Sequence, residues 1–126
     1  MGLSLSGLQQ RKERKIGICL SGGLSSLAVA SWLHTHGYDV EGFLLDIGQC
    51  ERKDFDEFTA SVRAAGIPLH AVDTRAAMAR AALDVVAFQA HYDGGYWNTT
   101  GLSRWVIVQS VAPLMRKAGC TVLAHA

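Results

Sequence analysis

Short apolar runs alternate with segments of helical pattern along this chain, and this alternation constrains the fold more than any other feature of the sequence. The apolar runs predict four β-strands, Ile16–Leu20, Val40–Leu45, Ile67–Val72 and Cys120–Ala124. The segments between them predict α-helices, the first over Leu24–His36. Strands that alternate with helices form parallel sheets with right-handed crossovers. We therefore expect an α/β fold, a doubly wound parallel sheet with helices on both faces.

Local signals add detail to this outline. Pro68, near the start of the third strand, suits an edge position because proline cannot donate to a neighbouring strand. Thr74 can begin an Ala-rich helix, whose expected core stripe is Met78, Ala82, Val85, Val86 and Gln89. Residues His91–Gly101 have no periodicity and predict a loop, followed by a helix over Leu102–Ala118. Long loops on α/β domains tend to carry function.

The first strand ends in Ser21-Gly22-Gly23, a turn that leads directly into the first helix. Glycine tolerates positive φ and lets the backbone approach a ligand closely. Ser25 and Ser26 add hydroxyl groups, and the helix behind them offers free N–H groups and the positive end of its dipole. This arrangement favours binding of an anion, most often phosphate. The alternative is a tight strand-to-helix turn that holds no ligand.

Composition and length limit the class of protein. The chain has 126 residues, a net charge of +1 and 49% hydrophobic residues, which is typical of a single globular domain. We expect a flexible basic tail over residues 1–14 and one folded domain over residues 15–126. The near-neutral charge argues against nucleic acid, and no apolar run is long enough to span a membrane. The odd cysteine count, Cys19, Cys50 and Cys120 without metal spacing, favours the cytoplasm.

Candidate binding segments follow the strands of the predicted sheet. In doubly wound sheets, ligands bind at the carboxyl ends of the strands. Ser21–Ser26, Asp46–Gln49 and the terminal pair His125–Ala126 all occupy such ends. The Asp46 carboxylate could contact a ribose, or it could cap the turn that follows its strand. The Tyr96 and Trp97 side chains could bind a ligand or pack the loop against the domain.

With these segments in place, the sequence resembles the N-terminal nucleotide-binding domain of the argininosuccinate synthases, from about Lys15 to Ala126. The resemblance rests on LSGGLSS at Leu20–Ser26, HGYDVEGFLLDIGQ at His36–Gln49 and YDGGYWNTTGLSR at Tyr92–Arg104. It implies an adenine nucleotide α-hydrolase fold and a ligase reaction in arginine biosynthesis. In that reaction ATP, with Mg²⁺, activates the ureido oxygen of citrulline as an adenylate and releases pyrophosphate. The amino group of aspartate then displaces AMP.

The resemblance also implies site residues, position by position. The ATP-binding residues that it implies are Cys19, Leu20, Ser21, Gly22, Gly23, Leu24, Ser25, Ser26, Leu27 and Leu45. The residues that it implies for an amino-acid-like substrate are Tyr96, Thr100 and Gly101. No residue is identified as a catalytic acid or base, and none as a metal ligand.

Several positions depart from the family pattern. Ser25 stands where the family's loop has Asp, Leu27 where it has Ser, Gly95 where it has Arg, and Gly101 where it has the Ser expected to hold the citrulline carboxylate. The chain also ends before the family's Gly-rich segment that completes the site. Whether the chain is an enzyme therefore stays open. It could be the ligase domain of an enzyme that is a homo-oligomer or has a companion chain. The alternatives are an inactive adenine-nucleotide-binding or assembly module, and a structural remnant.

Overall fold

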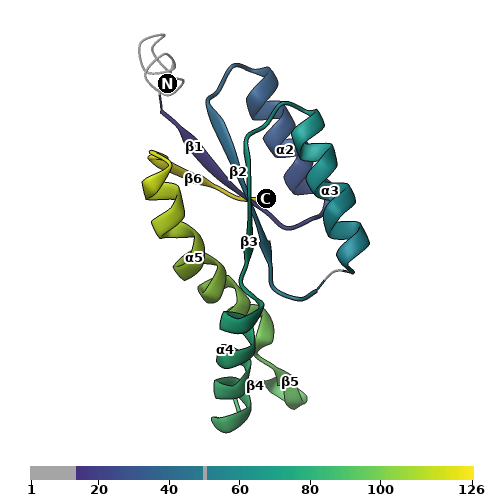
Figure 1. The fold of residues 1–126 in the computed structure, drawn as a ribbon. Helices are drawn as coiled ribbons and strands as arrows, with labels where there is room; N and C mark the ends of the chain where they lie inside the picture. Colours follow the sequence, from purple (N-terminus) through teal and green to yellow (C-terminus); the bar gives the residue numbers. More distant parts are fainter. Residues whose placement is uncertain (1–13, 50) are drawn as a thin grey trace.

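The structure of the chain is a computed structural model that describes residues 14–49 and 51–126, with the side chain of Arg52 left out. The tail predicted over residues 1–14 lies outside the described residues except for Arg14, and so does Cys50. Figure 1 shows the arrangement of the elements, a central sheet flanked by helices with a separate extension at one end.

Four parallel strands form the sheet, in the order β3-β2-β1-β6. They are β1 (Ile16–Leu20), β2 (Val40–Asp46), β3 (Leu69–Asp73) and β6 (Val122–Ala124). The register places Ile16 of β1 between Val40 and Val122. All four predicted strands are confirmed, and the bounds of β1 are those that the sequence predicts.

Helices cover both faces of the sheet, which confirms the predicted fold class (Figure 1). On one face α2 (Leu24–Thr35) and α3 (Arg52–Ala64) pack over a core that includes Ile18, Leu44 and Val62. On the other face α5 (Thr99–Lys117) contributes Val111 and Met115, which pack against Phe43. Because both faces are covered, β2 is buried at four successive positions, Gly42 to Leu45. Such continuous apolar runs are typical of parallel sheets.

The edge position of β3 agrees with its proline. Pro68 carries no N–H, but its carbonyl oxygen accepts a hydrogen bond from the Gly42 N–H at 2.8 Å. The strand proper begins only at Leu69, two residues later than the sequence predicts at Ile67. At the other end Asp73 pairs with Asp46, so both β2 and β3 run one residue beyond their predicted bounds.

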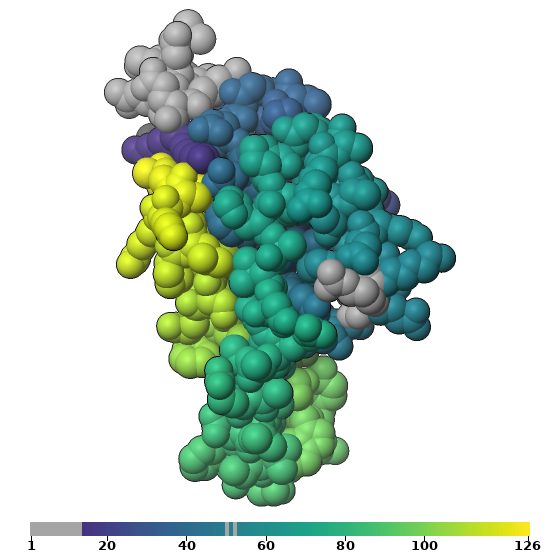
Figure 2. Space-filling model, in the orientation of Figure 1, coloured from purple at the N-terminus to yellow at the C-terminus, as the bar shows by residue number. Residues whose placement is uncertain are grey.

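An extension leaves the carboxyl end of β3, and we call residues 75–97 the arm. It consists of α4 (Arg75–Ala87), β4 (His91–Tyr92), the short helix η1 (Asp93–Gly95) and β5 (Tyr96–Trp97). The arm projects beyond the sheet, which is visible in both the ribbon and the space-filling view (Figures 1 and 2). Its large apolar side chains include several exposed ones, namely Leu83, Val86, Phe88, Tyr92 and Tyr96.

The expected core stripe of α4 is confirmed only in part, with Met78 and Ala82 half-buried. Val85 is buried as expected, but Val86 is 53% exposed, and Gln89 lies beyond the end of the helix at φ +51°. The reason is that α4 packs against α5 beyond the end of the sheet instead of lying on the sheet. A single helical neighbour buries a narrower stripe than a sheet face does.

The predicted loop at His91–Gly101 is largely a hairpin. β4 and β5 pair antiparallel, with His91 opposite Trp97 and Tyr92 opposite Tyr96. Aromatic cross-strand pairs of this kind stabilise hairpins. The helix α5 begins at Thr99, three residues earlier than the predicted start at Leu102. Thr100 and Gly101 therefore lie in the first turn of a helix and not in a loop.

Candidate functional site

The turn between β1 and α2 is held together by a buried hydroxyl group. Ser26 is 1% exposed, and its Oγ donates to the Gly23 carbonyl oxygen at 2.9 Å. The same Oγ accepts from the Ser21 N–H at 3.3 Å and lies 3.4 Å from the Ser21 Oγ. Gly22 has φ +83°, a conformation in which an L-residue would be strained. The Ser26 hydroxyl thus serves the shape of the turn, and the turn requires a glycine at position 22.

The outer side of the same turn is open to an anion. Ser21, Gly22, Gly23, Leu24 and Ser25 are all exposed. α2 begins at Leu24 without a side-chain cap, and its first turn contains no acidic residue. The first N–H groups of a helix have no intrahelical acceptor, and the helix dipole adds partial positive charge there. An anion at this position could therefore accept hydrogen bonds from these N–H groups. No carboxylate in the first turn of α2 would repel it.

Three of the predicted nucleotide-binding residues face the core and not the turn. Leu20 is 3% exposed, and Leu27 packs against the core cluster on the α2 side. Cys19 is half-buried on the α5 side, and burial raises the pKa of its thiol. Leu20 can therefore contribute only through its backbone, whereas Cys19 and Leu27 are partly exposed. Ser25, at the position where a carboxylate was expected, presents an exposed hydroxyl-bearing side chain.

A cleft lies beside the turn, at the carboxyl ends of β1 and β2. The turn forms one part of its lining, the end of β2 another, and the first two turns of α3 the third. The lining residues are Ser21, Gly22, Leu44, Leu45, Asp46, Ile47, Gln49, Asp54, Phe55 and Phe58. Of the phosphate-loop candidates, Ser21 and Gly22 therefore share this cleft with Leu45, whereas Gly23, Leu24, Ser25, Ser26 and Leu27 do not line it.

Asp46 acts as a turn cap in this structure. Its Oδ1 accepts a hydrogen bond from the Gly48 N–H at 2.9 Å, and its Oδ2 lies 3.6 Å from Nε of Arg75. Arg75 also forms a hydrogen-bonded ion pair with Asp73. The hydrogen bond to Asp73 is the main cause that raises the pKa of the Arg75 guanidinium. Of the two interpretations of Asp46, the structure shows the turn-capping contact.

The candidates for the second substrate form a separate group. The Tyr96 Oη lies 3.2 Å from the Thr100 Oγ1, so the hairpin and the head of α5 are joined at this point. Gly101 lies next to Asn98, whose Oδ1 is buried without a hydrogen-bond partner among the described residues. Neither Tyr96, Thr100 nor Gly101 lines the cleft beside the phosphate loop.

Two aromatic residues of the cleft were missed as site residues. Phe55 and Phe58 look like the inner face of a helix in the sequence, and both do pack against the core. Both also line the cleft. The signal that could have found them is their position, because α3 follows the carboxyl end of β2 after a short connection. Side chains of the first turns of such a helix reach the edge of the sheet where ligands bind.

Two structural features are absent from residues 14–49 and 51–126, the part of the chain that the structure describes. No group of three or more His, Cys, Asp or Glu side chains there could hold a metal ion. No helix in that part has the length and apolar character needed to cross a membrane.

A parallel sheet with helices on both faces and a glycine turn between β1 and the helix that follows defines a doubly wound α/β domain with a ligand-binding edge at the carboxyl ends of its strands. The chain belongs to the family described as arginosuccinate synthase N-terminal HUP domain, whose model matches residues 15–126. The resemblance noted in the sequence is thereby confirmed.

Curated relatives agree with this assignment. The chain is similar to the argininosuccinate synthase of Haloquadratum walsbyi, with 35% identity over 113 residues, and to that of Bacillus velezensis, with 28% identity over 116 residues. These matches cover 88% and 90% of this chain but only 28% of each relative.

The solved structures share the fold. The glutamine-dependent NAD⁺ synthetase of Acinetobacter baumannii, in complex with ADP, matches at 15% identity with a TM-score of 0.67, over 92% of this chain and 22% of that chain. The NMN synthetase of Francisella tularensis matches at 14% identity with a TM-score of 0.62, over 93% of this chain and 47% of that chain.

Proposed function

We propose that the chain is the nucleotide-binding domain of an argininosuccinate synthase-like ligase, and that it binds ATP in the cleft at the carboxyl ends of β1 and β2. The observation that carries this proposal is the open glycine turn, whose exposed residues and helix N–H groups adjoin an apolar cleft. The phosphates would lie on Ser21, Gly22 and Gly23, and the nucleoside would extend toward Leu45.

The reaction that this site would serve is transfer of an adenylyl group to a citrulline-like ureido oxygen. That oxygen is a poor leaving group, and adenylation makes it a good one. The N–H groups at the start of α2 would hold the phosphates and stabilise the negative charge that develops as pyrophosphate leaves. Tyr96 and Thr100 would contact the amino-acid-like substrate from the hairpin side, and the rest of the enzyme would close over both. We place the domain at residues 15–126 and the enzyme in the cytoplasm.

The described residues fit the phosphates of ATP better than they fit its Mg²⁺. Mg²⁺ is usually bound by one or two carboxylates together with substrate phosphates. Asp46 is engaged with Gly48 and Arg75, which leaves Asp54 as the other carboxylate in the cleft lining. When bound, Mg²⁺ would neutralise charge on the phosphates. We propose that it enters with the nucleotide, since Ser25 offers a hydroxyl in place of the family's carboxylate.

This substitution also favours a second candidate function. A domain with Ser at position 25 and Gly at position 101 could bind adenine nucleotide without turnover, as a regulatory or assembly module. Such a module would still need a partner, either another copy of this chain or a companion chain. The two candidates differ in one measurable quantity, the release of pyrophosphate when citrulline and aspartate are supplied together with the companion chain.

Calorimetric titration with ATP and Mg²⁺ tests the shared part of both candidates. Gly23→Val is the test variant, because Gly23 has φ −93° and an added Cβ would meet only the Ser21 Oγ, at 3.5 Å. The fold should therefore tolerate the substitution while the anion position is blocked. Ala28→Val, on an exposed position of the same helix, is the matched control.

We expect micromolar affinity in the unmodified chain and in Ala28→Val, and a loss of at least ~10-fold, about 1.4 kcal/mol, in Gly23→Val. No heat up to about millimolar ATP, or equal affinity in both variants, would refute the proposed nucleotide site.

A further inference from the structure

We propose that Phe55 forms a stacking surface for the base of the nucleotide, so that the cleft recognises the aromatic ring as well as the phosphates. This inference rests on the proposed function, because it assigns a role to a residue of the same site. The cleft brings together an anion-binding turn and a wall with two aromatic rings, which is the arrangement that a nucleotide requires.

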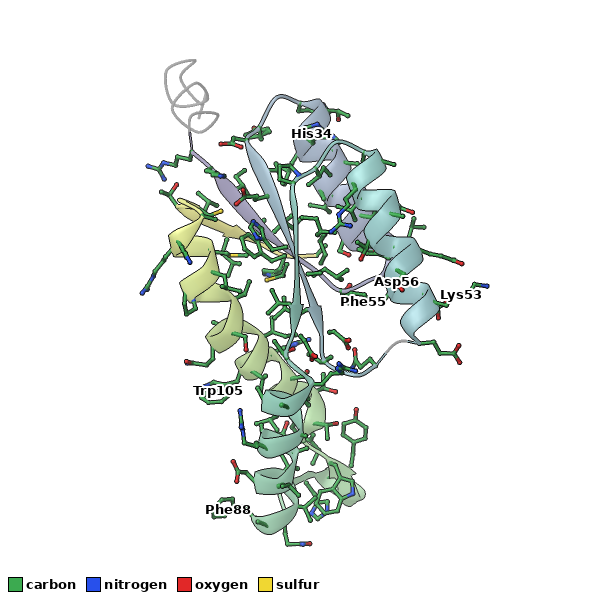
Figure 3. The ribbon with its side chains drawn as sticks, in the orientation of Figure 1. His34, Lys53, Phe55, Asp56, Phe88 and Trp105 are labelled. Atoms are coloured by element: carbon green, nitrogen blue, oxygen red, sulfur yellow. The ribbon has the colours of Figure 1, made fainter. Side chains whose placement is uncertain are left out.

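Phe55 lies on α3, three residues beyond the first residue of that helix. It is half-buried, and part of its side chain packs against the core beneath α3. Figure 3 shows Phe55 on the side of α3 that faces the sheet, whereas Phe88 lies at the far end of the arm. Phe55 therefore contacts the core and also lines the cleft. Its contacts with the core restrain the ring before any ligand binds.

The lining of the cleft combines a polar turn with apolar side chains. Ser21 and Gly22 belong to the turn before α2, where the helix dipole attracts negative charge. Leu44, which packs in the same core cluster as Phe55 and Phe58, adds apolar surface to the lining, whereas the Leu45 side chain packs in the cluster on the opposite face of the sheet. A nucleotide combines an anionic group and an aromatic ring in the same way. A free phosphate or an aliphatic anion would contact only the turn at Ser21 and Gly22.

The side chains that could read the edge of a base are few. Asp46 is occupied by Gly48 and Arg75, so Gln49 and Asp54 are the other polar side chains that line the cleft outside the turn. Recognition of the ring face therefore contributes more here than recognition of the ring edge. Stacking is tolerant of base identity, because every base has a π-face.

The experiment compares two ligands, ATP and tripolyphosphate, which has the phosphates but no base. Both are titrated with Mg²⁺ into the full chain and into three variants. Phe55→Leu keeps an apolar side chain on the core but removes the ring. Phe55→Tyr keeps the ring, and Phe88→Leu makes the same change at a side chain that is 80% exposed on the arm. Circular dichroism checks that each variant is folded.

We expect ATP affinity to fall about 2- to 13-fold in Phe55→Leu, because aromatic pairs contribute beyond the apolar area that they bury. Phe55→Tyr and Phe88→Leu should bind ATP within about two-fold of the unmodified chain, and tripolyphosphate affinity should be the same in all four proteins.

Three results would overturn the inference. ATP affinity that is unchanged or higher in Phe55→Leu would mean that the ring is no stacking surface. An equal loss for ATP and tripolyphosphate would mean that Phe55 only supports the turn. If the unmodified chain binds neither ligand, the proposed function itself fails. If the chain binds ATP and the affinity does not change in Phe55→Leu, only the role of Phe55 fails.

Discussion

Replacement of Gly101 by alanine tests the local geometry at the head of α5. An ideal Cβ at position 101 would lie 2.5 Å from the Asn98 Oδ1 and 3.3 Å from the Tyr92 Oη. The first distance is far below van der Waals contact, so the Asn98 amide must move to admit any side chain. The Asn98 Oδ1 has no hydrogen-bond partner among the described residues. Moving this oxygen therefore breaks no hydrogen bond to a described residue.

The expected free-energy change follows from two opposing terms. Alanine is favoured over glycine inside a helix by up to about 1 kcal/mol. Moving the Asn98 side chain out of its rotamer costs roughly 0.5–1.5 kcal/mol. Gly101→Ala alone should therefore change the free energy of unfolding by less than about 0.5 kcal/mol. In an Asn98→Ala background the contact with Asn98 Oδ1 is absent and only the 3.3 Å contact with the Tyr92 Oη remains, so the same substitution should stabilise the chain by up to about 1 kcal/mol, or a Tm increase of up to about 4 °C.

The assay is a double-mutant cycle by urea and thermal unfolding of four proteins: the unmodified chain, Gly101→Ala, Asn98→Ala and the double variant. A coupling energy of about 1 kcal/mol between the two positions would support the geometry. If Gly101→Ala stabilises the chain equally with and without the Asn98 side chain, the two positions do not compete for the same space, and the reasoning is wrong.

Two other predictions concern the turn and the thiols. Ser26→Ala removes the buried hydroxyl that joins Gly23 to Ser21, and urea unfolding should show a destabilisation of about 1–2 kcal/mol. The control Ser25→Ala, at an exposed site, should cost less than about 0.5 kcal/mol. Equal losses in the two variants would refute the role of Ser26. Burial raises the pKa of Cys19 and of Cys120, so in a Cys50→Ser variant both thiols should alkylate more slowly than a free thiol near neutral pH. Stability should fall as pH rises above the ordinary thiol pKa, because the unfolded chain ionises first, and alkylation as fast as glutathione at pH 7 would contradict this.

The sheet was largely predictable from the sequence. β1 was placed at its observed bounds because an apolar run ended in a glycine turn, and local signals at both ends were unambiguous. The stripe of α4 was not predictable, since Val86 and Gln89 obey a helical period whichever neighbour the helix has. Periodicity identifies an apolar face but not the element that covers it. Here the neighbour was α5 and not the sheet, and only the three-dimensional arrangement reveals this.

The candidate site was predictable only in part. The turn at Ser21–Gly23 follows from residues that are adjacent in the sequence, so pattern and chemistry could be read together. The position of Phe55 in the lining of the cleft depends on the pairing of β1 with β2, which brings α3 near the turn. The packing of Asn98 against Gly101 depends on where α5 begins, and the sequence placed that start three residues too late.

The position of β1 in the sheet has a consequence for how this chain folds. β1 is an interior strand, with β2 on one side and β6 on the other, and Lys15 at its head donates to the carbonyl oxygen of Ala118, 103 residues away. During synthesis, β1, β2 and β3 can pair early, but the second neighbour of β1 appears only with Val122–Ala124. Contacts between distant parts of a chain form slowly because loop closure costs entropy. Until then, β1 presents unpaired backbone groups along one edge, and an open strand edge of this kind promotes pairing with other chains.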